Sequence, residues 1–159
     1  MAVKWLSKAA KQGHVDAQHE LGDCYRSGIG VKGQNYVAAA KWYREAAQQG
    51  HAAAQMSLAG LYSTGEGVGG KNLPVMAELI HEVATRGDKA AQVRMARCFE
   101  EGTGVPQNAK TAAQWRSKAG VPSFTSSSAC YGFFANNAKA VATTVAATVV
   151  AGILAYSYS

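Results

Sequence analysis

Four histidines are the residues of this sequence that are best suited to bind a metal ion or to transfer a proton. His14 and His51 lie at equivalent points of the chain, and each directly follows a glycine. His14 and His19 form the one close pair, H-x-x-x-x-H, without a cysteine cluster beside it. His19 and His81 are expected to pair with neither His14 nor His51. Because a metal site needs several converging ligands, we expect no metal, and interpret His14 and His51 as residues at helix starts.

The cysteines and the glycine-rich loops provide no better basis for catalysis. Cys24 and Cys98 occupy equivalent positions of distant repeats and are expected to be packing residues beyond disulfide reach, while Cys130 stands alone. The loops G-I-G-V, G-E-G-V and G-T-G-V lack the G-K-[ST] ending and the preceding strand of a phosphate-binding loop. No acidic or serine residue combines with a base into a catalytic set. We therefore expect no cofactor and no enzymatic activity.

These loops belong to an internal repeat of 37, 37 and 36 residues. Glycine recurs at positions 13, 50 and 87, glutamine at 18, 55 and 92, and an aromatic residue at 25, 62 and 99. Trp5 corresponds to Trp42, to Leu79 and, after a one-residue deletion, to Trp115. A period of this length is typical of solenoid proteins, in which each unit packs against its neighbours.

Each unit is predicted to form two α-helices. Apolar residues recur at helical spacing from about residue 36 to 49, and Gly50 ends that helix. A second helix is predicted from about 52 to 63, and a last short helix at about 108–118. Small residues would let the helices approach closely, and the large Trp, Leu and Tyr side chains would fill the remaining gaps. Residues 1–120 are thus predicted to form an all-α solenoid of about three helix-turn-helix repeats.

The repeat resembles the Sel-1-like repeat, a relative of the tetratricopeptide repeat. Residues 39–68 follow the family pattern almost letter for letter: A-A-K-W-Y-R-E-A-A-Q-Q-G-H-A-A-A-Q-M-S-L-A-G-L-Y-S-T-G-E-G-V. Residues 5–31 also match, whereas the third unit has Leu79 and Ile80 where Trp and Tyr are usual. The resemblance implies a scaffold or adaptor, in some cases within a membrane-associated complex. It does not name the partner.

Charge divides the chain into two parts. The chain has 16 Lys and Arg and 10 Asp and Glu, a net charge of +6, and Lys139 is the one charged residue after position 120. The mild positive charge permits an anionic partner, but no nucleic acid is expected, because there is no long basic run with interleaved aromatic residues. Residues 121–138 are expected to form a linker. Residues 139–159 are predicted to form one transmembrane helix, in which residues 140–158 would be about 28 Å long, close to the bilayer core of about 30 Å.

The predicted membrane helix carries two stripes at a spacing of four. The branched stripe is expected to face lipid. The small stripe is expected to pack on a partner helix in the membrane, and consists of Thr143, Ala147, Ala151 and Ala155. Basic residues before the helix would keep the repeats on the cytoplasmic, or the stromal or matrix, side. The alternative is a soluble Sel-1-like adaptor whose C-terminal helix caps the solenoid.

The sequence therefore predicts a non-catalytic protein–protein interaction scaffold. We expect it to be a membrane-anchored accessory subunit of a larger membrane complex, for example a photosynthetic or respiratory one, with other protein subunits and membrane lipid as partners. The first helix of each repeat is expected to line the concave surface of the solenoid. The predicted partner-binding residues on this surface are Lys4, Lys8, Lys41, Arg44 and His81.

Overall fold

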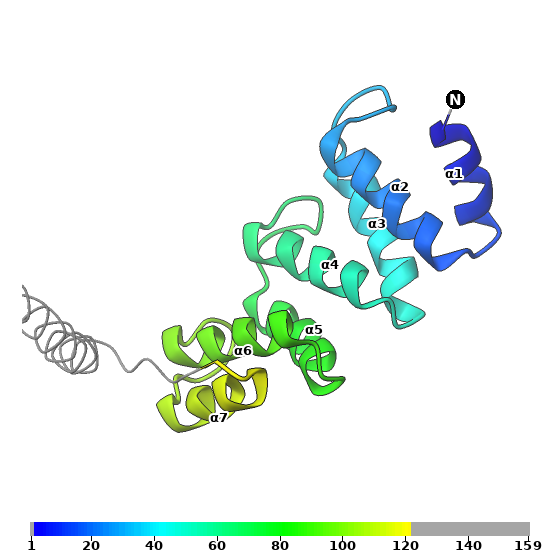
Figure 1. Cartoon of the computed structure of the whole chain (residues 1–159). Coiled ribbons are helices and arrows are strands. Elements are labelled where there is room, and N and C mark those ends of the chain that lie inside the picture. The colour runs from blue at the N-terminus through cyan, green and yellow to red at the C-terminus, as the bar shows by residue number, and fades with distance from the viewer. Residues whose placement is uncertain (1, 122–159) are drawn as a thin grey trace, which may run out of the picture. The chain divides into compact units, whose positions relative to one another are not determined.

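The computed structural model describes residues 2–121, and residues 1 and 122–159 lie outside the described part (Figure 1). The described part contains no strand and seven α-helices: α1 Ala2–Lys11, α2 Val15–Ser27, α3 Tyr36–Gln48, α4 Ala52–Thr64, α5 Leu73–Thr85, α6 Lys89–Glu101 and α7 Ala109–Ala119. None of these seven has the length and apolar character needed to span a bilayer. The membrane helix predicted at 139–159, with its stripe of Thr143, Ala147, Ala151 and Ala155, lies outside the described residues.

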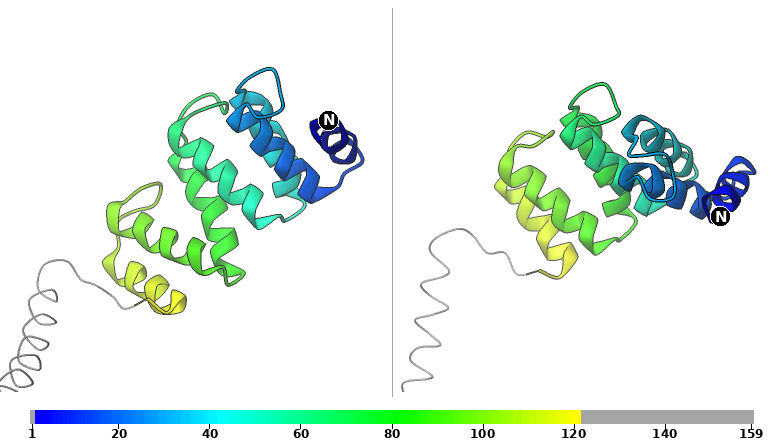
Figure 2. Two further views of the ribbon diagram at one scale, coloured as in Figure 1. Left: turned by 45° about the horizontal axis from the view of Figure 1, so that its top comes forward. Right: turned by 90° about the horizontal axis from the view of Figure 1, so that it is seen from above.

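The described helices stack in the order of the sequence (Figure 2). Every pair of helices in extensive contact is consecutive along the chain, from α1 with α2 to α6 with α7. Each helix therefore buries its apolar side against its immediate neighbours, as in a repeat solenoid. The predicted all-α solenoid is confirmed for this part. The three predicted helices agree with α3, α4 and α7 to within one residue at each end.

An asparagine starts each first helix of the later repeats. The side-chain oxygen of Asn35, Asn72 and Asn108 accepts a hydrogen bond from the backbone N–H three residues further on, at 2.9, 3.3 and 3.0 Å. This bond satisfies an N–H group that the first helical turn cannot pair. The backbone N–H of each asparagine also donates to the carbonyl group of the recurring aromatic residue, at positions 25, 62 and 99. The asparagine thus fixes where the loop ends and the helix begins.

The second glycine of the G-x-G-V loop allows the loop to lie against the first helix of the same repeat. A Cβ atom on Gly67 would stand 2.2 Å from the carbonyl oxygen of Tyr36, and one on Gly104 would stand 2.1 Å from that of Leu73. Both glycines also have a positive φ, +71° and +76°, which is strained for other residues. Close packing of backbone on backbone therefore explains the glycine-rich loop, with no need for a bound phosphate.

The core is built largely from alanines, with a few large side chains between them. The largest fully buried side chains are those of Tyr43, Leu21, Gln55 and Val83. Tyr43 on α3 packs against Gly22 on α2, where a Cβ atom would stand 2.6 Å from the tyrosine ring. The equivalent residues of the next repeat are Ala59 and Ile80, which share one core cluster. A smaller side chain on one helix thus faces a larger one on the next.

The tryptophan column of the repeat is buried to very different degrees. Trp115 on α7 is 6% exposed, whereas Trp5 on α1 is 69% exposed. The reason is that α7 packs on α6, the second helix of the repeat before it, whereas α1 has extensive contact with α2 alone among the described helices. The prediction that these large residues fill gaps in the core is therefore right for Trp115 and wrong for Trp5.

Candidate functional site

The five predicted partner-binding residues are all exposed, and they lie on the first helices α1, α3 and α5: Lys4, Lys8, Lys41, Arg44 and His81. Within the described residues, no ion pair ties any of these lysines or the arginine to an acidic group. His81 is more constrained, because its ring lies at 82° to that of Trp115, with the ring centroids 5.6 Å apart. The four cations are thus available to an acidic partner.

The structure brings His19 next to His51, contrary to the expectation that His19 pairs with neither His14 nor His51. Their ring centroids are 4.9 Å apart, where α2 meets the start of α4. His51 caps α4, since its Nδ1 accepts a hydrogen bond from the N–H of Ala54 at 3.1 Å, and its Nε2 lies 3.2 Å from Asp16. His14 holds the same position before α2 without a side-chain cap. The predicted location of His14 and His51 at helix starts is confirmed.

The surroundings of His19 contain a serine and an aspartate, but not in the arrangement of a hydrolytic triad. The Nε2 atom of His19 lies 3.4 Å from Oγ of Ser57 and 3.7 Å from Oδ2 of Asp23. A triad base uses one ring nitrogen for the nucleophile and the other for the carboxylate, whereas here both groups face the same nitrogen. Burial lowers the pKa of His19, so its ring is neutral at pH 7. In residues 2–121, no group of three potential ligands lies close enough to hold a metal ion.

The hydroxyl group of Tyr43 links the first two repeats. It donates a hydrogen bond to Asp23 at 2.6 Å and accepts one from Nε of Arg26 at 3.1 Å. Burial, followed by the hydrogen bond to Asp23, raises the pKa of Tyr43 to about 12. The hydroxyl therefore stays protonated at neutral pH. Its hydrogen bonds hold α2 against α3, which makes this network structural.

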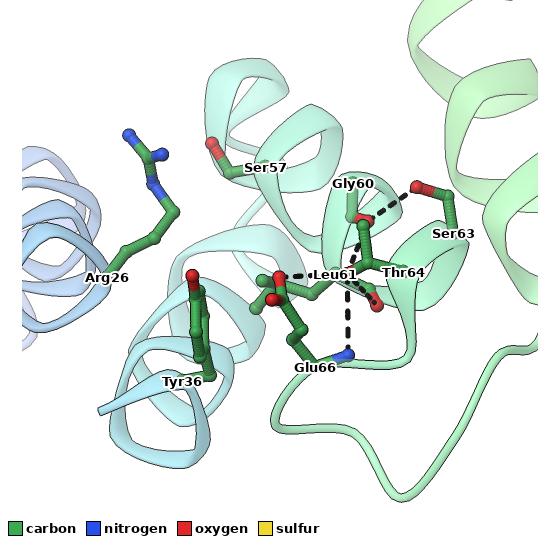
Figure 3. A pocket seen from close by; sticks show the side chains of 8 residues that line it. All are labelled: Arg26, Tyr36, Ser57, Gly60, Leu61, Ser63, Thr64 and Glu66. Atoms are coloured by element: carbon green, nitrogen blue, oxygen red, sulfur yellow. Dashed lines mark hydrogen bonds between the residues drawn. The ribbon is translucent and has the colours of Figure 1, made fainter. Parts of the chain in front are cut away.

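A hollow of about 350 Å³ lies where α2, α3 and α4 approach one another (Figure 3). Its lining residues are Arg26, Tyr36, Ser57, Gly60, Leu61, Ser63, Thr64 and Glu66. Several of its polar groups already bond to the end of α4: Ser63 donates to the carbonyl of Gly60 at 2.7 Å, and Thr64 accepts from the N–H of Glu66 at 3.4 Å. A second hollow of about 350 Å³ borders Glu78 and His81. Neither arrangement combines a nucleophile, a base and an orienting group.

The two cysteines of the described part have no catalytic surroundings. Cys98 is buried and Cys24 is half-buried, and both are free thiols. Burial is the main cause that raises the pKa of each thiol. A thiol with a raised pKa carries little thiolate at neutral pH and is a poor nucleophile. Both residues therefore fit the packing role predicted for them, and Cys130 lies outside the described residues.

Two of the solved structures similar to this chain are each 36% identical to it. One is a protective antigen of uropathogenic Escherichia coli strains displaying an SLR fold, with a TM-score of 0.70. The other is a Sel1 repeat protein from Oxalobacter formigenes, with a TM-score of 0.69. Each match covers 74% of this chain, but 25% of the first protein and 48% of the second. This chain therefore spans about a quarter and about half of their respective lengths.

A more distant similarity supports the fold alone. The cysteine rich protein B of Helicobacter pylori is 21% identical, with a TM-score of 0.56, and the match covers 75% of this chain and 89% of that one. No significant match exists among curated proteins. The model of the Sel1 repeat matches residues 1–14, 15–51, 52–77 and 89–120, which is most of the chain. The chain therefore belongs to the Sel1 repeat family.

Proposed function

We propose that this chain is a non-catalytic adaptor that binds another protein through the exposed side chains of its first helices. Sel1 repeat proteins are protein-interaction scaffolds, and their fold is generally non-catalytic. The observation that carries the proposal is the set of exposed cations on consecutive first helices, without acidic partners in the described residues: Lys4, Lys8, Lys41 and Arg44.

The arrangement of these cations favours an acidic protein surface as the partner. Exposed charges on a stacked array of helices can meet several acidic groups of one partner at once, and complementary charge raises the association rate and the specificity of binding. Lys41 and Arg44 lie on α3, next to the half-buried Trp42. Aromatic residues and arginine are enriched among the residues that dominate binding energy. We therefore expect α3 to be central to the interface.

Charge reversal on α3 tests this proposal. The double variant Lys41→Glu and Arg44→Glu should lose a protein that co-purifies with the full chain from its source cells. The matched control is Lys89→Glu and Arg94→Glu, which makes the same change of charge at exposed positions of α6. It should retain the protein. Equal loss in both variants would point to net charge instead of a specific surface, and retention in both would refute the proposed site.

The adaptor function requires the repeats alone, and these are the residues that the family match covers. Anchoring in a membrane is a separate claim, and its support is the absence of charge from residues 140–159. We therefore place the adaptor first and the membrane-anchored accessory subunit second. Alkaline carbonate extraction of the full chain distinguishes them, since an integral anchor stays in the membrane pellet and an adaptor without one is released.

A further inference from the structure

The outer side of the second helices changes its charge from one repeat to the next. Two positions of each second helix, three residues apart, recur at the repeat spacing of 37 residues and are exposed or half-buried. They are occupied by Glu20 and Asp23 on α2, by Ser57 and Gly60 on α4, and by Arg94 and Arg97 on α6. We call these residues the outer face. It is acidic on α2, uncharged on α4 and basic on α6.

Most charges of the outer face have no partner within the described part of the chain. No ion pair among residues 2–121 involves Glu20, Arg94 or Arg97. Glu100, the acidic residue three positions after Arg97, already pairs with Arg116 at 2.6 Å. One acidic and two basic side chains of the outer face are thus available to an external partner.

Small residues on α4 separate these opposite charges. The helix α4 contains no charged residue. A Cβ atom added to Gly60 would meet nothing within 4 Å, and Ser57 lies one helical turn before it. Ala53, one turn further back, is exposed. Because the distance between packed helices depends on the side chains at the contact, another helix can approach α4 closely along this line.

Opposite charges on the two sides of a neutral centre make the outer face complementary to itself. A two-fold axis that lies in this face and runs along α4 places α2 of one copy opposite α6 of the other, and the same contact occurs twice. Equivalent repeat positions then face each other, so that Glu20 meets Arg94 and Asp23 meets Arg97 of the second copy. Asp23 also pairs with Arg26 of its own chain at 3.3 Å, so Glu20 and Arg94 form the more exclusive pair. A two-fold axis across the helices would instead place α2 on α2 and α6 on α6, which brings like charges together.

The charges of the outer face favour a second copy over the remainder of this chain as its occupant. Residues 122–159 contain one charged residue, Lys139, which cannot neutralise Arg94 and Arg97. A second copy, in contrast, supplies carboxylates for α6 and guanidinium groups for α2 at the matching positions. Arginine can form two parallel hydrogen bonds to one carboxylate, and its long side chain does not require α2 and α6 to touch.

We infer that two copies of this chain form a symmetric dimer through their outer faces. The two α4 helices pack against each other at the axis, along Ala53, Ser57 and Gly60. On either side of the axis, α2 of one copy pairs with α6 of the other, and the pair of Glu20 with Arg94 selects this arrangement. The inference goes beyond the proposed adaptor function, because it uses the second helices in place of the first ones.

Sedimentation equilibrium of the purified full chain tests this inference by an exchange of charges. The wild-type chain should be a dimer that dissociates as the salt concentration is raised. Glu20→Arg and Arg94→Glu should each weaken the dimer by about tenfold or more, because each places like charges opposite one another at two points. The double variant should dimerise again. An equimolar mixture of the two single variants should form a heterodimer, since opposite charges then meet at both contacts.

The matched control is Lys110→Glu, which makes the same change of charge as Arg94→Glu at an exposed position of α7. It should leave the dimer unchanged. Circular dichroism at 222 nm should show the wild-type helical signal in every variant, because all three substituted side chains are exposed.

Three results would overturn the inference: a wild-type chain that stays monomeric, a dimer that both single variants leave unchanged, or single variants that do not dimerise when mixed. Capture of a partner through Lys41 and Arg44 should survive loss of the dimer, because that surface lies on the first helices. If the dimer is absent while this capture persists, the inference is wrong and the adaptor function stands.

Discussion

The contact between Gly22 and Tyr43 predicts that two glycine-to-alanine substitutions in neighbouring repeats have opposite effects. Both Gly22 and Gly60 lie within second helices, and neither has a positive φ. Alanine in a helix is more stable than glycine by about 1 kcal/mol. At Gly60 the added Cβ meets nothing within 4 Å. Gly60→Ala should therefore stabilise the protein by about 0.5–1 kcal/mol.

At Gly22 the same change is opposed by packing. The new Cβ would lie 2.6 Å from Cε1 of Tyr43, and that ring cannot easily move, because it is 0% exposed and its hydroxyl is bonded to Asp23 and Arg26. Overpacking a core costs roughly 1–3 kcal/mol. After the helix gain is subtracted, Gly22→Ala should destabilise the protein by about 1 kcal/mol. The two alanine variants should thus differ by about 2 kcal/mol.

The repeat itself provides the compensating change. The next repeat has Ala59 opposite Ile80 at these positions, so Tyr43→Ile should make room for alanine at position 22. In a double-mutant cycle, we expect a coupling energy of about 1–2 kcal/mol between the two substitutions. Urea unfolding followed by circular dichroism at 222 nm measures the four proteins of this cycle together with Gly60→Ala. If Gly22→Ala stabilised the chain as much as Gly60→Ala does, the packing argument would be refuted.

Three further predictions concern a loop, a helix cap and a histidine. Gly67→Ala should lower the free energy of unfolding by more than about 2 kcal/mol in thermal or urea unfolding, because both the positive φ and the contact with Tyr36 oppose it. The control Gly69→Ala, also at positive φ but with open space, should lower it by about 1–2 kcal/mol. Equal losses would contradict the close approach of Gly67 to Tyr36. Asn72→Ala should lower the free energy of unfolding by about 1 kcal/mol, because the cap of α5 is lost. Urea unfolding measures this change, and a change within error would count against the cap. Burial lowers the pKa of His19 below the ordinary histidine value of 6.5, so the unfolded chain binds the proton more readily and the free energy of unfolding should fall as pH drops below 6.5. His19→Gln should flatten this slope in unfolding measured from pH 7.5 to 5.5, and an unchanged slope would rule out His19 as its source.

The helices could be predicted from the sequence because the residues that mark each helix boundary recur in several repeats. Gly50 and its equivalents end the first helices, and the G-x-G-V loops end the second ones. The asparagine caps could also have been predicted, since Asn35, Asn72 and Asn108 recur at the repeat spacing just before the first helices. What allowed these predictions is that helix ends depend on local hydrogen bonds, which the local sequence determines.

The contacts between repeats could not be predicted in the same way. His19 and His51 meet because the second helix of one repeat lies beside the start of the second helix of the next, and no local spacing indicates this. The exposure of Trp5 also depends on which helix covers α1, whereas its sequence column resembles that of the buried Trp115. Of the candidate site, the five side chains predicted to bind a partner are exposed. Their binding role remains a prediction.

The most direct test of the central claim compares cross-linking from the two kinds of helix in the source cells. A photo-reactive benzophenone is placed at position 44 on α3 in one variant of the full chain and at position 94 on α6 in another, both at exposed sites. If the first helices form the binding surface of an adaptor, position 44 gives an adduct with one defined protein and position 94 gives none with it. Equal adducts at the two positions, or no protein adduct at position 44, would contradict the claim.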